Sequence, residues 1–133
     1  MASIGIDISS DSLDCYSTTL QSHKAFPNTD KGCKALVQWI KSQIPKHIIL
    51  EPTGGYEQPL CGALHDAGLA FSLVQAYRFR SFARSSGQLA KTDRLDAKVL
   101  AEYGLRMEPA PTFFEKNKNL SCLVTRRRQL VDL

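Results

Sequence analysis

Four carboxylates stand where the predicted backbone could bring them to one point. Asp7 lies in the apolar run that opens the chain, Glu51 ends the apolar run 48–50, and Asp93 and Asp96 lie together further on. Converging carboxylates repel one another unless a cation lies between them, and a hard divalent metal prefers oxygen ligands. The pattern therefore indicates a metal site built from Asp7, Glu51, Asp93 and Asp96.

The elements expected around these residues could aim them at a shared site. Flanked by Ile6 and Ile8, Asp7 points to the opposite face of its strand. Glu51 follows a strand, at the edge where sites form in open α/β sheets, and Pro52 favours an extended conformation for it. Asp93 and Asp96 are three residues apart and share a helix face.

Each carboxylate also has a purely structural interpretation. Asp93 and Asp96 could cap the start of a helix, Glu51 could accept amide protons from the Gly54-Gly55 turn, and Asp7 could be a buried, hydrogen-bonded acid. Each structural role is favoured for a residue taken singly. The metal site is favoured for the set, because basic residues and glycines flank it.

Hydrophobic spacing predicts an α/β fold with a mixed sheet. Strands are expected at 2–9, 13–20, 23–26, 47–50 and 71–74, and helices at 30–44, 59–67, 77–83, 93–105 and 117–133. The first three strands should form an antiparallel meander, and the strands that alternate with helices should pair in parallel. We expect one domain over 1–110, and in 111–133 the start of a helical linker toward a domain that is absent here.

Charge and composition narrow the class of protein. The 133 residues carry a net charge of +4, and no apolar run approaches the ~20 residues of a membrane helix. The four cysteines form no C-x-x-C pair, which favours reduced thiols over a zinc site. Residues 76–98 hold six basic and two acidic groups, so this stretch could attract a polyanion, although a solvated helix face is the common alternative. The candidates for phosphate contacts are Arg78, Arg80, Arg84, Lys91 and Arg94.

Several segments together resemble the DEDD transposases of bacterial insertion sequences, of the insertion sequence one-ten type that includes the pilin-gene invertases. The matching segments, in family order, are Gly-Ile-Asp-Ile-Ser at 5–9, Phe-Pro-Asn-Thr at 26–29, Glu-Pro-Thr-Gly-Gly-Tyr-Glu at 51–57, Arg-Phe-Arg-Ser-Phe-Ala at 78–83 and Lys-Thr-Asp-Arg-Leu-Asp-Ala at 91–97. The resemblance covers essentially the whole chain. It departs from the family where Ser10 stands near a common lysine, and at 75–77, where an Asn-Pro pair is often found.

The resemblance implies an RNase H-like (RuvC-like) fold and a metal-dependent enzyme acting in DNA transposition. The family's acidic tetrad falls on Asp7, Glu51, Asp93 and Asp96, which would bind Mg²⁺ or Mn²⁺ for strand cleavage and joining. DNA, a structured guide RNA and further copies of the protein are the implied partners, in the cytoplasm of a bacterium near its nucleoid. The family's serine-containing second domain does not occur before Leu133.

Two other functions stay open. A nucleic-acid-binding or oligomerisation module, inactive without a further domain, would share this composition. An actin-like or sugar-kinase-like ATPase also begins with Gly-Ile-Asp-Ile on a strand, but it needs a second glycine-rich phosphate motif, which is not found in this sequence.

Overall fold

The computed structural model describes residues 1–75, 81–82 and 93–114, without the side chains of 93–95. The strands are β1 (Ala2–Ile8), β2 (Ser12–Ser17), β3 (Ser22–Pro27), β4 (Pro45–Leu50) and β5 (Ser72–Leu73). The helices that lie wholly within the described residues are α1 (Asp30–Lys41), α2 (Gln58–Asp66) and α4 (Asp93–Met107). The elements that the sequence predicts within these ranges are all present, with boundaries shifted by a few residues.

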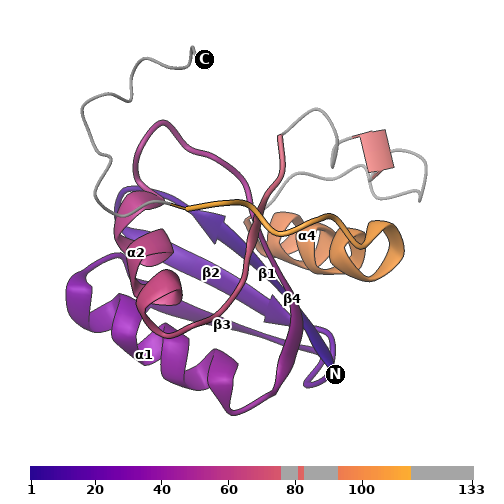
Figure 1. The fold of residues 1–133 in the computed structure, drawn as a ribbon, viewed down its shortest axis with the longest axis horizontal. Helices are drawn as coiled ribbons and strands as arrows, with labels where there is room; N and C mark the ends of the chain where they lie inside the picture. Colours follow the sequence, from indigo (N-terminus) through magenta and orange to yellow (C-terminus); the bar gives the residue numbers. More distant parts are fainter. Residues whose placement is uncertain (76–80, 83–92, 115–133) are drawn as a thin grey trace.

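The five described strands form one mixed sheet in the order β3-β2-β1-β4-β5 (Figure 1). β1 pairs antiparallel with β2, and β2 pairs antiparallel with β3. β4 lies parallel to β1 on its other side, and β5 lies parallel to β4. The mixed sheet with an antiparallel first half, predicted from the sequence, is therefore confirmed.

Helices cover the two faces of the sheet. α1 and α2 lie on one face, where their apolar residues pack with Ile4, Ile6 and Ile8 of β1. α4 lies on the other face, across β1, β2 and β4 (Figure 1). Alternate residues of β1 thus face the two layers of helices, which is why the strand is buried along nearly its whole length, with Ile4, Ile6 and Ile8 on one face and Ser3, Gly5 and Asp7 on the other.

Local signals explain where the helices begin and end. The Thr29 hydroxyl accepts a hydrogen bond from the Gly32 amide at 3.0 Å and caps α1. Gly68 follows α2 with φ +75°, a conformation that favours glycine.

Residues 109–114 run beside the edge strand β5. The Thr112 amide donates to the Phe71 carbonyl at 2.8 Å, and the Leu73 amide donates to the Thr112 hydroxyl at 2.8 Å. The helix predicted at 117–133 lies outside the described residues, as does most of the helix predicted at 77–83. Phe82, within the described part, packs edge-on against Tyr103 at 5.6 Å between ring centroids.

Candidate active site

The strand register places Asp7 beside Glu51. Ile6 of β1 pairs with Leu50 of β4 in parallel, so the next residue along each chain is a carboxylate. Neighbouring strands lie about 4.8 Å apart, and residues at matching positions share a face. Both side chains are half-buried. The sheet thus brings two of the four predicted carboxylates together at the carboxyl end of its parallel pair.

α4 reaches the same place because its backbone lies directly on β1. A Cβ built on Gly5 would overlap the Ala97 carbonyl oxygen and would lie 2.5 Å from the Ala101 amide nitrogen. Nearer the start of β1, the Ser3 hydroxyl donates to the Ala101 carbonyl at 2.6 Å. Later residues of β1 therefore meet earlier residues of α4, and the two elements run in opposite directions.

This crossing carries the first turn of α4 toward Asp7. Two residues of β1 advance about 6.6 Å, and four residues of α4 advance about 6 Å. Gly5 lies against Ala97. Two residues further along β1 is Asp7, and four residues back along α4 is Asp93, so the backbones of these two residues lie at about the same height along the sheet. Asp96 is half-buried and precedes Ala97 in sequence. The predicted tetrad therefore comes from β1, the end of β4 and the start of α4.

The described side chains do not themselves form a closed metal cage. Among them, no group of three or more His, Cys, Asp or Glu side chains is close enough to hold a metal ion, and the Asp93 side chain lies outside this set. Asp7, Glu51 and Asp96 each make a contact with other groups. The structure thus shows that β1, the end of β4 and the start of α4 meet at one end of the sheet.

Sequence reasoning did not single out Asp14, a further carboxylate at this site. In the antiparallel register Asp14 of β2 lies directly opposite Asp7 of β1, so the two occupy the same face. The Ser12 hydroxyl donates to Asp14 Oδ2 at 3.3 Å. The alternation of residues in β2 could have indicated this position. Leu13 and Cys15 face α1, so Asp14 between them faces the opposite side of the sheet.

The loop after Glu51 is held by Glu57. Glu57 Oε1 accepts hydrogen bonds from the Thr53 amide at 3.0 Å, the Thr53 hydroxyl at 2.8 Å and the Gly55 amide at 3.1 Å. Burial by itself raises the pKa of Glu57, but these hydrogen bonds outweigh it, and the pKa lies below its ordinary value. The structural alternative for Glu51 was a hydrogen bond from the Gly54-Gly55 turn, and the Gly55 amide of this turn donates to Glu57.

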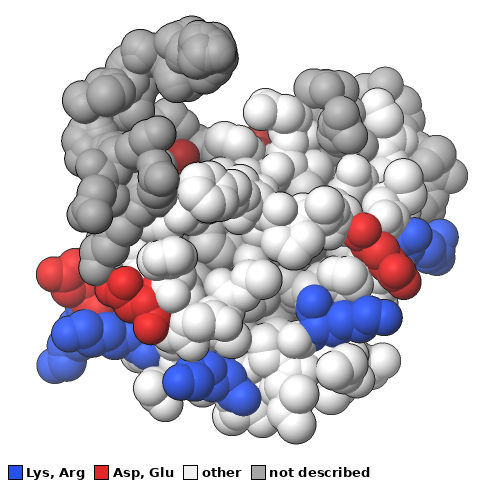
Figure 2. All heavy atoms as spheres, in the orientation of Figure 1, with Lys and Arg blue, Asp and Glu red and all other residues white. Residues whose placement is uncertain are grey.

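The basic residues predicted to contact phosphate lie beyond the described side chains. Arg78, Arg80, Arg84 and Lys91 fall in undescribed segments, and Arg94 lies in α4 without a described side chain. Figure 2 shows acidic atoms recessed in the hollow along the upper edge of that view, with Lys and Arg side chains along the lower part. None of the helices in the described ranges has the length and apolarity to cross a bilayer.

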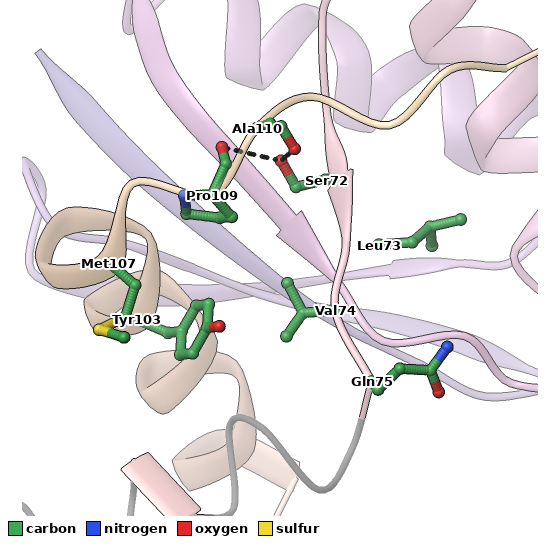
Figure 3. A pocket seen from close by; sticks show the side chains of 8 residues that line it. All are labelled: Ser72, Leu73, Val74, Gln75, Tyr103, Met107, Pro109 and Ala110. Carbon is green, nitrogen blue, oxygen red and sulfur yellow. Dashed lines mark hydrogen bonds between the residues drawn. The ribbon is translucent and has the colours of Figure 1, made fainter.

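A separate cavity of about 460 Å³ lies between β5 and the last turns of α4 (Figure 3). Val74, Tyr103 and Met107 line it, and the Ser72 hydroxyl beside it donates to the Ala110 carbonyl at 2.9 Å. None of its lining residues is a carboxylate. It is therefore distinct from the carboxylate site.

Comparison with known proteins gives a family and two curated relatives. A family model described as a transposase, of the DEDD type and the IS110 group, matches residues 4–133. The pilin gene-inverting proteins of Moraxella lacunata and Moraxella bovis are 32% and 31% identical to this chain over 141 residues. These alignments cover 96% of this chain and 44% of each relative, so the chain spans less than half of their length.

Two solved structures share the fold. RuvC of Thermus thermophilus in complex with a Holliday junction substrate superposes with a TM-score of 0.64 at 13% identity, covering 84% of this chain and 99% of that one. A second Thermus thermophilus RuvC structure gives a TM-score of 0.60 at 15% identity, covering 84% of this chain and all of that one (100%). The RuvC-like, RNase H-type fold expected from the sequence is confirmed.

Proposed function

Because this chain belongs to the DEDD transposase family of the IS110 group, we propose that it carries the metal-dependent catalytic domain of a DNA transposase or site-specific recombinase. The reaction proposed is cleavage and joining of DNA strands. The chain matches less than half of its curated relatives, so the activity of a whole protein is part of this proposal.

The observation that carries the proposal is the placement of Asp7 beside Glu51, under the start of α4. Three elements from distant parts of the sequence deliver acidic residues to one end of the sheet. Side-by-side carboxylates are costly unless protons, hydrogen bonds or a cation offset their repulsion. A cation bound between these carboxylates would offset their repulsion, which favours a metal site over a purely structural role.

The donor set fits a hard divalent cation. Asp7, Glu51, Asp93 and Asp96 offer only carboxylate oxygens, which suit Mg²⁺ or Mn²⁺ and not softer metals. When bound, such a cation supplies Lewis-acid activation of an attacking oxygen and stabilisation of a leaving one. The protein's own part is to hold these carboxylates on rigid elements, with Glu57 fixing the loop that follows Glu51.

The proposed partners follow from the family. DNA is the substrate, a structured RNA is the proposed guide, and several copies of the full-length protein are proposed to act together in the cytoplasm, near the nucleoid of a bacterium. Arg78, Arg80, Arg84, Lys91 and Arg94 would contact phosphates. The catalytic domain is proposed to span 1–110, with 111–133 leading into a helical linker.

Calorimetric titration of Mn²⁺ into the wild-type chain and Asp7→Ala, with and without a DNA duplex, tests this proposal. We expect binding in the wild type that Asp7→Ala abolishes, with circular dichroism showing both chains folded. Binding that needs the duplex would mean that nucleic acid completes the site. No binding under either condition would favour a nucleic-acid-binding or oligomerisation module instead.

A further inference from the structure

Asn28 joins the two loops that follow the strands of the candidate site. Its Nδ2 group donates to the Ser9 carbonyl at 2.9 Å and to the Tyr56 carbonyl at 3.1 Å. Ser9 stands two residues after Asp7, and Tyr56 stands five residues after Glu51. One amide group therefore ties the loop beyond β1 to the loop beyond β4.

Asn28 is itself fixed in place. Its backbone amide donates to the Asp11 carbonyl at 3.0 Å, in the loop between β1 and β2. A Cβ at Gly32 would overlap the Pro27 carbonyl oxygen, so the first turn of α1 packs closely on the chain before Asn28. The Cys33 thiol approaches Asn28 Oδ1 at 3.9 Å. Because these contacts fix the position of Asn28, its side chain can restrain the two loops to which it donates.

Hydrogen bonds hold the second loop together, because the Glu57 carboxylate accepts from the amides of Thr53 and Gly55 within it. A tether at Tyr56 therefore acts on the whole segment from Pro52 to Glu57. With Ser9 as the other anchor, the tether limits how far the end of β4 can separate from the end of β1. Among uncharged side chains, only asparagine and glutamine carry two N–H donors on one nitrogen, and glutamine is one methylene longer.

We propose that Asn28 is a positioning residue that presets the separation of Asp7 and Glu51 before a cation binds. This inference rests on the proposed function of those carboxylates. Loss of a residue that supports metal ligands typically weakens metal affinity by about 10–100-fold. Because Asn28 acts through two loops, we expect its loss to weaken affinity by about tenfold.

The test compares Mn²⁺ affinity, by calorimetry, in the wild-type chain, Asn28→Ala and Thr29→Ala, with the duplex present if the wild type requires it. Thr29→Ala is the matched control, because it removes the cap of α1 but keeps the tether. We expect about tenfold weaker binding in Asn28→Ala, and binding within about twofold of wild type in Thr29→Ala despite a lower melting temperature.

Equal affinity in Asn28→Ala and wild type would overturn the inference while leaving the metal site standing. A wild-type chain that binds no Mn²⁺ would overturn the metal site and the inference together. If Asn28→Ala does not fold, Asn28→Asp replaces it under the same criteria. Its carboxylate lacks the two donors and by charge alone would strengthen cation binding, so a weaker affinity could only come from the lost tether.

Discussion

Gly5 sets how closely α4 approaches β1. Any side chain there meets the backbone of α4 at Ala97 and Ala101 and the Leu100 side chain. We expect Gly5→Ala to destabilise the chain by about 3 kcal/mol, the upper part of the usual range for overpacking, because helix backbone cannot move aside as a side chain can. Urea unfolding measures the change.

Gly62→Ala provides the matched control. A Cβ at Gly62, within α2, meets no atom within 4 Å. Since alanine favours a helix by up to about 1 kcal/mol over glycine, this variant should be as stable as wild type or more stable. If Gly5→Ala proved equally harmless, the close packing of α4 on β1 would be wrong, and with it the route that brings Asp93 and Asp96 to Asp7.

Glu57 should make stability depend on pH. Its pKa is lowered in the folded chain, so its stabilising effect is complete above the unfolded value of about 4.3 and is lost as pH falls through the lower folded value. We expect Glu57→Gln to cost about 1–3 kcal/mol at pH 7, because it weakens the bonds to Thr53 and Gly55. Unfolding curves of both chains from pH 7 to pH 3 should converge toward the acid end. A constant difference across that range would contradict the role given to the Glu57 carboxylate.

The connection between α1 and β4 contains a strained residue. Ile44 has φ +52° and is 68% exposed, although β-branched side chains disfavour this left-handed region. We expect Ile44→Gly to raise stability by about 0.5–1 kcal/mol, since relief of strain exceeds the entropic cost of glycine. Ile44→Val keeps the branched side chain and should change little. A lower melting temperature for Ile44→Gly would show that Ile44 makes a contact worth more than its strain.

The elements of this fold were predictable because each has a strong local signal. Alternation marks β2, helical spacing and Thr29 mark α1, and Gly68 marks the end of α2. The directions of strand pairing also followed, since short turns give antiparallel pairs and helical crossovers give parallel ones. Element ends were less certain: β5 extends over Ser72–Leu73 only, because the sequence cannot show where pairing with β4 stops.

The candidate site was predictable in its residues but not in its supports. Asp7 and Glu51 follow from strand ends, which sequence pattern locates well. Asp14 was missed because its position depends on the exact β1–β2 register. Asn28 stood out only as part of the Phe-Pro-Asn-Thr segment at 26–29. Its bonds to Ser9 and Tyr56 join segments 19 and 28 residues away, which no local pattern reveals.

At the scale of the whole molecule, charge is divided unevenly. The side chains that the structure describes include ten acidic and seven basic groups, a net charge of −3, whereas the full chain is +4. The described side chains therefore give no net attraction for a polyanion. If the chain binds DNA as proposed, we expect the attraction to come from the remaining basic segments, of which 78–92 precedes α4 in the sequence.

The double variant Arg80→Ala/Arg84→Ala tests that division of charge. Each phosphate contact contributes about 0.9 to the slope of log affinity against log salt, so two lost contacts should weaken duplex binding and make the slope shallower by about 2. Lys31→Ala/Lys41→Ala removes the same charge from α1, on the face of the sheet opposite α4. It lowers the net charge equally, so it controls for the loss of total charge. Equal losses in both double variants would mean that DNA responds only to total charge. A loss confined to Arg80→Ala/Arg84→Ala would show that DNA contacts the segment that precedes α4 in the sequence.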